Sequence, residues 1–199
     1  MEAAIGRLVR LAAIAGGIVL VGLTLVTVAS IFGRIVVTMA NASDAPSWHA
    51  IFSPVLRAIG GVLASLGIRP VPGDYELVES GVGFAVFAFM GWAVMQRGHA
   101  TVDLLMPFYA NRFNRFMDLV SDLLILGVAA FIAWRHWTGT LEKMANGETT
   151  FILQYPTWWS YALSMAGALV FVLASLVSVL RAWRALRQNA AVTSTGAVH

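Results

Sequence analysis

The sequence has no cysteine, and this absence removes several classes of chemistry. None of the 199 residues can form a disulfide, a thiolate metal site, an iron–sulfur cluster or a cysteine nucleophile. A glycine-rich phosphate loop is also missing, and the serines, acids and histidines show no recognisable nucleophile and base arrangement. We therefore expect no enzyme, no catalytic residue, no ATP use, and no cofactor or metal site.

Charge is the second scarce property. Only 12% of the residues are charged and 59% are hydrophobic, whereas about a quarter of the residues in soluble domains are charged. The chain is therefore predicted to be an integral membrane protein. Its net charge is +3, but the basic residues are spread over several loops and form no continuous stripe, which argues against a nucleic-acid partner.

Four stretches are long and apolar enough to cross a bilayer, which needs about 20 residues of helix. They cover residues 11–33, 77–96, 116–138 and 157–181. Asp118 and Asp122 lie in the first two turns of the third stretch, on one helix face, where the helix dipole tolerates negative charge. The predicted fold is an all-α single membrane domain with four transmembrane helices and a flexible tail at 188–199.

The N-terminal span resembles a signal peptide, because Arg7 and Arg10 precede an apolar run. That run is longer than the roughly 7–15 residues of a signal sequence, and no convincing Ala-x-Ala cleavage site follows. We interpret it as a retained signal-anchor span.

A long insert at residues 41–73 separates the first two spans. Its apolar residues recur at helical spacing, but Pro54, Arg57, His49 and a Gly-Gly pair argue against a fifth crossing. An interfacial amphipathic helix or a re-entrant segment fits better, and a contact with a partner protein is also open.

The distribution of basic residues predicts the orientation, because cytoplasmic loops carry an excess of Lys and Arg. With four spans, both termini and the middle loop share one side. That side holds Arg7, Arg10, Arg97, Arg112, Arg115, Arg181, Arg184 and Arg187, and the other holds Arg34, Arg57, Arg69, Arg135 and Lys143. Both termini are therefore predicted to be cytoplasmic.

The middle loop, residues 97–115, begins with "RGHATVD" and forms a polar corner. Arg97 and His99 follow the end of the second span, where cations interact well with the helix dipole, and Gly98 gives the backbone freedom to turn. The rest of the loop mixes apolar residues with Asp103 and arginines, which predicts a short amphipathic segment along the cytoplasmic interface.

The stretch "GWAVMQRGHATVDLL", which contains Trp92, Arg97, Gly98, His99 and Asp103, resembles the small Q-type four-span subunit of tripartite ATP-independent periplasmic (TRAP) transporters. The resemblance extends to an arginine ending the first span (Arg34), a glutamate opening the second (Glu79), and a Gly-Glu-Thr-Thr…Pro-x-Trp approach to the last. The long insert departs from the family pattern, in which a short loop joins the Arg34-like and Glu79-like positions.

This resemblance implies a scaffold subunit in the bacterial inner membrane. Its partners would be a large many-span subunit, which carries out cation-coupled uptake, and a periplasmic binding protein, which delivers a solute, often a carboxylate. The chain itself has no inverted repeat and no pair of broken helices, which are the features that mark a transport site.

Several residues have two interpretations. Arg34 is either a snorkelling interfacial cation or the partner of Glu79 or Glu76, joining the first two spans. Arg97, His99 and Asp103 form a local network or contact the large subunit. Gly81, Ala85 and Ala88 are small residues spaced for close helix approach, and they serve either packing within the subunit or a seam between subunits.

A membrane-anchor subunit of a redox complex is the alternative function. Haem ligation requires histidines on facing helices at matched depth. His99 and His136 are predicted at opposite edges of the membrane, while His49 lies in the insert and His199 ends the chain. The histidines therefore disfavour this alternative.

Overall fold

The computed structural model describes residues 2–41, 53–96 and 111–188. These residues form five helices: α1 (Glu2–Ala40), α2 (Ser53–Ser65), α3 (Asp74–Met95), α4 (Asn111–Asn146) and α5 (Trp158–Gln188).

Four of these helices are long and apolar enough to cross a membrane, as the sequence predicts: α1, α3, α4 and α5. The insert contributes α2, which has 13 residues and is too short for a crossing that needs about 20. The expected all-α fold with four spans and one additional short helix is confirmed. Of the cytoplasmic corner expected at 97–115, residues 97–110 lie outside the described residues, and residues 111–115 belong to the first turns of α4 and not to the loop.

Three of the spanning helices extend well beyond the predicted apolar stretches. α1 has 39 residues, α4 has 36 and α5 has 31. At about 1.5 Å per residue, α1 is nearly twice as long as the roughly 30 Å hydrocarbon core. It must therefore incline within the bilayer, project beyond it, or both.

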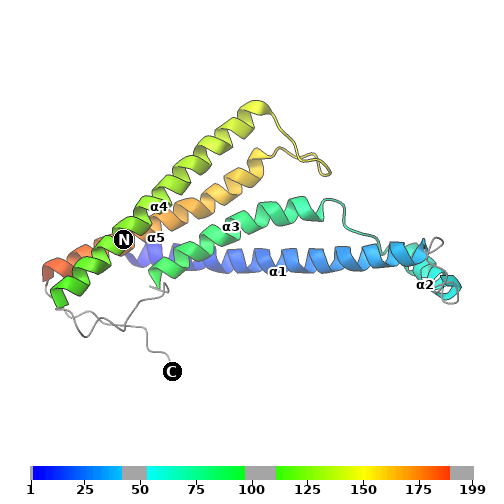
Figure 1. The fold of residues 1–199 in the computed structure, drawn as a ribbon, viewed down its shortest axis with the longest axis horizontal. Coiled ribbons are helices and arrows are strands. Elements are labelled where there is room, and N and C mark those ends of the chain that lie inside the picture. The colour runs from blue at the N-terminus through cyan, green and yellow to red at the C-terminus, as the bar shows by residue number, and fades with distance from the viewer. Residues whose placement is uncertain (1, 42–52, 97–110, 189–199) are drawn as a thin grey trace, which may run out of the picture.

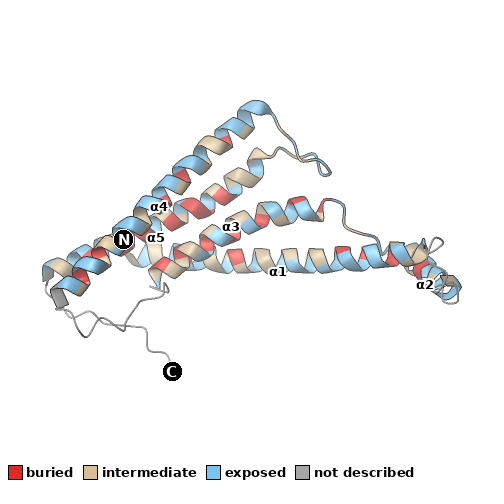
Figure 2. Ribbon diagram, in the orientation of Figure 1, coloured by how far each residue is buried: buried red, intermediate tan, exposed pale blue. Residues whose placement is uncertain are grey.

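The helices are arranged around α5, which packs against α3, α4 and α1 (Figure 1). α1 runs along α3, and α2 lies at the far end of α1 (Figure 1). Half of the apolar window of α5 is buried, compared with 6% of the window of α1. Figure 2 shows the same contrast along the two ribbons. α1 is therefore an outer element of the bundle, with most of its apolar surface left for lipid or protein.

Small residues allow α1 and α3 to approach closely. Ala85 and Ala88 are completely buried, and a Cβ atom built on Gly16 of α1 would lie 3.3 Å from the Cα of Ala85. A Cβ atom on Gly81 would collide with the side chain of Leu23 on α1. The predicted small-residue face therefore serves internal packing.

The other side of α3 packs just as closely on α5. A Cβ atom on Gly167 of α5 would lie 2.9 Å from the carbonyl oxygen of Phe84. Nearby, Val94, Ala129 and Phe171 form a buried cluster drawn from α3, α4 and α5. α3 is thus packed tightly between α1 and α5.

The first and last described helices meet at one end of the bundle. The Glu2 carboxylate at the start of α1 pairs with Arg184 and lies 3.5 Å from Nε of Arg181, both near the end of α5. The start of α1 and the end of α5 therefore lie on the same side, as an even number of spans requires (Figure 1).

Candidate functional site

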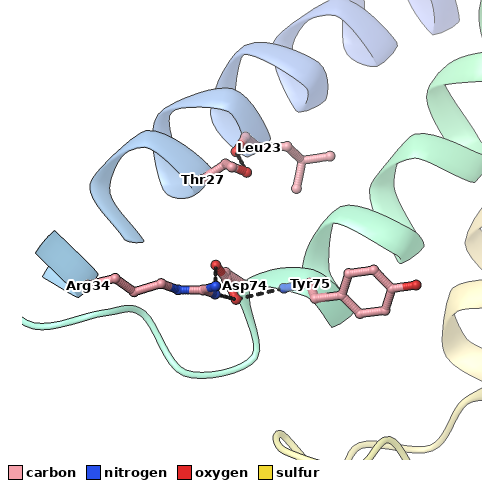
Figure 3. Close-up of polar contacts among 5 residues, drawn as sticks. All are labelled: Leu23, Thr27, Arg34, Asp74 and Tyr75. Carbon is pink, nitrogen blue, oxygen red and sulfur yellow. Dashed lines mark hydrogen bonds and ion pairs between the residues drawn. The ribbon is translucent and has the colours of Figure 1, made fainter. Parts of the chain in front are cut away.

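Arg34 of α1 and Asp74 of α3 form an ion pair at the other end of α1. The Arg34 Nη2 atom donates to both carboxylate oxygens of Asp74, at 2.7 and 3.0 Å (Figure 3). Asp74 Oδ1 also accepts a hydrogen bond from the N–H of Tyr75 at 3.0 Å. Asp74 is the first residue of α3, where the helix dipole favours a negative charge. The pair therefore joins the two helices just where the chain returns from the insert.

The prediction that Arg34 pairs with Glu79 or Glu76 is wrong. α3 begins three residues before the predicted span, because the left-handed Gly73 (φ 73°) turns the chain into the helix there. Asp74 consequently faces α1, while Glu76 lies two residues further on and points to another neighbour. Glu79 is exposed.

Glu76 binds the loop between α4 and α5. Its Oε1 accepts a hydrogen bond from the N–H of Ile152 at 2.6 Å, and its Oε2 accepts one from the N–H of Leu153 at 2.9 Å. The residue is 8% exposed. Hydrogen bonds to an ionised group are about twice as strong as neutral ones, so this single side chain fastens the loop to the start of α3.

The α4–α5 loop has additional bonds of its own. Thr150 N–H donates to the carbonyl of Tyr155 at 2.9 Å, and Thr157 N–H donates to that of Glu148 at 3.0 Å. The Glu148 carboxylate accepts hydrogen bonds from Lys143 and Asn146 at 2.6 and 3.1 Å, and these contacts lower its pKa. The loop is thus a compact hairpin, which the Glu76 side chain also attaches to α3.

Three hydroxyl groups lie next to the contact between Glu76 and the loop. Ser80 Oγ is 2.5 Å from the Tyr155 hydroxyl and 2.6 Å from Ser160 Oγ. The Tyr155 hydroxyl also lies 3.2 Å from the backbone oxygen of Glu76, to which it can donate. Together these groups connect α3, the loop and the start of α5.

We call Arg34, Asp74, Glu76, Ser80, Tyr155 and Ser160 the α3 polar cluster. Its two carboxylates are both engaged in contacts that join chain segments. Within residues 2–41, 53–96 and 111–188, no group of three His, Cys, Asp or Glu side chains is placed to hold a metal ion. The cluster therefore has a structural role: its hydrogen bonds and its ion pair hold α1, α3, α5 and the loop together.

Most of the chain matches one known protein family. Residues 59–185 match the family described as tripartite ATP-independent periplasmic transporters, DctQ component. The chain belongs to this family. The match covers more than half of the sequence and includes α3, α4, most of α5 and the polar corner. This DctQ protein is therefore a small subunit of a TRAP transporter, and its family is a transporter component and not an enzyme family.

The family match does not extend to α1 or to the first part of the insert. A search of curated proteins found no match, and a search of solved structures found none either. The polar cluster lies across the boundary of the match, because Arg34 precedes it and the other members fall inside it.

The site residues predicted from the sequence do not form one site in the DctQ protein. Arg34 belongs to the α3 polar cluster, whereas Glu79 is exposed and Trp92 is half-buried, more than three helical turns away along α3. Arg97, Gly98, His99 and Asp103 lie outside the described residues. Their roles as a local network or a partner contact remain predictions.

A second polar region lies on α4, near the end of the bundle where the start of α1 meets the end of α5. Arg115 is buried, and its Nη1 donates to the carbonyl of Ala185 on α5 at 3.4 Å. Asp118 and Asp122 are half-buried at three and seven residues from Arg115, on the same helix face. The arginine thus tethers α4 to α5.

His136 is the one histidine among the described residues. Its ring stacks on Tyr161 at 5.2 Å, and its Nε2 atom lies 3.0 Å from the Tyr161 carbonyl oxygen. His136 therefore has a structural role in the packing of α4 against α5. Membership of the DctQ family gives no support to the alternative of a redox-complex anchor.

Sequence reasoning missed most of the α3 polar cluster. Asp74, Ser80, Tyr155 and Ser160 were not singled out, and Glu76 was considered only as a partner for Arg34. One available signal was the pair of acids Asp74 and Glu76, since negative charge is favoured in the first turn of a helix. No sequence signal placed the backbone N–H groups of the α4–α5 loop beside Glu76, because that contact arises from tertiary packing.

Proposed function

We propose that this DctQ protein is the scaffold subunit of a cation-coupled TRAP importer in the bacterial inner membrane. A large many-span subunit would move the solute, and a periplasmic binding protein would deliver it. The solute would carry a carboxylate, as the family resemblance implies.

The scaffold role is supported by the contacts of two acidic side chains near the start of α3, which both bind other segments of the chain. Asp74 is engaged by Arg34, and Glu76 by two backbone N–H groups of the loop. Both carboxylates are therefore committed to holding helices together. A subunit whose polar groups hold its own helices together is rigid, and a rigid subunit is suited to supporting a larger partner.

The proposed orientation has both termini in the cytoplasm. The start of α1 and the end of α5 share one end of the bundle through Glu2 and Arg184, and the excess of arginines falls on that side. The α3 polar cluster would then face the periplasm, at the level where a substrate-binding protein approaches.

Affinity purification from the native membrane tests the proposal. The tagged chain is extracted in mild detergent, and the proteins that copurify are identified and quantified by mass spectrometry. We expect a stoichiometric many-span membrane protein. A redox protein as the stoichiometric companion, or recovery of the chain alone under conditions that preserve other membrane complexes, would contradict the proposal.

The cytoplasmic corner allows a second test that separates assembly from transport. Arg97→Ala combined with Asp103→Ala should lower the recovery of the complex, while uptake per assembled complex is retained. Normal recovery with lost uptake would instead show that the corner takes part in transport. Arg187→Ala, at the exposed end of α5, is the matched control for loss of a cytoplasmic arginine.

A further inference from the structure

The helix α2 carries an apolar stripe that no other described part of the chain covers. Val55, Ile59 and Val62 follow one another at helical spacing and are 58%, 48% and 61% exposed. Leu66 continues the stripe, because its N–H bonds to the carbonyl of Val62 at 3.1 Å, and it is 72% exposed. These four side chains project within a narrow sector of the helix.

The opposite side of the same helix is fixed to α1. Gly60 is buried, and a Cβ atom built on it would lie 2.5 Å from the backbone nitrogen of Ala40. The neighbouring Gly61 has nothing within 4 Å of such a Cβ atom. α2 is therefore held by one glycine against the end of α1, and the apolar stripe has a defined direction relative to the span.

The segment after α2 returns to the level of the α3 polar cluster. Gly33 directly precedes Arg34 in α1, and a Cβ atom built on Gly33 would lie 2.3 Å from the backbone of Arg69 and Pro70. Ala40 is seven residues beyond Gly33, or about 10 Å along α1. α2 thus lies beside the end of the membrane span, close to the depth at which an interfacial helix lies.

The charge of this segment has one sign. Residues 53–73 contain Arg57 and Arg69, both exposed, and no acidic residue. Arg57 projects from the side of α2 away from the apolar stripe. An apolar face, a cationic opposite face and the absence of acids are the features of helices that bind at the surface of anionic bilayers.

We infer that α2 is a lipid-binding element that lays Val55, Ile59, Val62 and Leu66 into the adjacent bilayer leaflet, while Arg57 and Arg69 attract anionic phospholipid headgroups. Because α2 is fixed to the end of α1, this contact also sets the inclination of the 39-residue α1 helix. The inference does not depend on which solute the transporter moves or on the identity of the large subunit.

The absence of cysteine allows a direct test in the full chain. Single-cysteine variants Val62→Cys and Gly61→Cys are labelled with an environment-sensitive nitrobenzoxadiazole fluorophore. The proteins are then reconstituted into vesicles of brominated phosphatidylcholine, with or without phosphatidylglycerol. Gly61→Cys is the matched control, because it is adjacent in sequence and lies outside the stripe.

The inference predicts blue-shifted emission and severalfold stronger bromine quenching at position 62 than at position 61. Phosphatidylglycerol should increase the quenching at 62, and Arg57→Gln combined with Arg69→Gln should remove that increase. Equal quenching at both positions would overturn the inference. So would a fluorophore at 62 that aqueous iodide reaches freely until the large subunit is added, because the stripe would then be a protein-binding surface.

Discussion

The guanidinium of Arg34 and the carboxylate of Asp74 meet across 40 residues of sequence, with 2.7 Å between Nη2 and Oδ2. The Arg34 side chain is 61% exposed and that of Asp74 is 13% exposed. The pair closes the insert into a loop whose two ends are held together. Its effect is therefore expected to be local, because exposed ion pairs contribute little to global stability.

A double-mutant cycle with Arg34→Gln and Asp74→Asn tests this pairing. Each single variant should lower the melting temperature in detergent by at most about 4 °C, and the double variant should show positive coupling. Arg34→Gln with Glu79→Gln serves as the control cycle, since Glu79 should show no coupling. Additive effects for Arg34 and Asp74 would contradict the pair.

Glu76→Gln should loosen the α4–α5 loop. Glutamine replaces one carboxylate oxygen with an NH2 donor that cannot accept an N–H, so the amides of Ile152 and Leu153 should exchange hydrogen faster by on the order of tenfold. Hydrogen–deuterium exchange with mass spectrometry measures this change. Glu79→Gln, one turn further along α3, is the matched control and should leave the loop unchanged.

Tyr155→Phe tests the hydroxyl cluster. Removal of the phenolic oxygen leaves Ser80 and Ser160 with one partner fewer, which should lower the free energy of unfolding by about 1 kcal/mol. The effect should fall when Ser80 is already alanine, because the two hydroxyls belong to one network. Equal losses in the presence and absence of the Ser80 hydroxyl would show that the two groups act independently.

Gly60→Ala and Gly61→Ala form a pair of neighbouring variants with opposite predictions. A methyl group at position 60 meets the backbone of Ala40, so this variant should destabilise the attachment of α2 by about 1–3 kcal/mol. At position 61 the space is open, and alanine should be neutral or stabilise the helix by up to about 1 kcal/mol. Limited proteolysis of the insert distinguishes the two, and equal sensitivity would contradict the packing of α2.

The order of the α4–α5 loop should depend on pH through Glu148. Because Lys143 and Asn146 lower the pKa of this carboxyl in the folded protein, its contribution is present above the unfolded pKa and is lost as pH falls through the folded pKa. The protection of the Thr157 amide, which bonds to the Glu148 carbonyl, should therefore fall only at acidic pH, when its exchange rate is compared with the intrinsic rate at the same pH. Glu148→Gln should remove this dependence.

The helices could be predicted from sequence because the bilayer imposes a length of apolar residues that is visible in the chain. The Gly81, Ala85 and Ala88 face was likewise readable, since small residues at helical spacing indicate close packing. The additional turns of α1, α4 and α5 were not predicted. These helices continue past the apolar stretches into residues 34–40, 139–146 and 182–188, because the end of an apolar run does not mark the end of a helix.

The polar contacts were less predictable than the spans. Arg34 was recognised as a residue that could join two helices, but its partner depended on where α3 begins. The Glu76 contact depends on backbone groups 76 and 77 residues away, and backbone amides carry no sequence signature. Local pattern therefore pointed to Arg34 and Glu76 alone within the α3 polar cluster, and only tertiary packing determined what these side chains bind.

The measurement that tests the central claim most directly is uptake by the reconstituted large subunit with and without this chain. Proteoliposomes receive the binding protein, its solute and a cation gradient in both cases, and the thermal stability of the large subunit is measured in parallel. A scaffold role predicts that omission of the chain lowers both the stability of the large subunit and the uptake. Full stability and full uptake without the chain would contradict it.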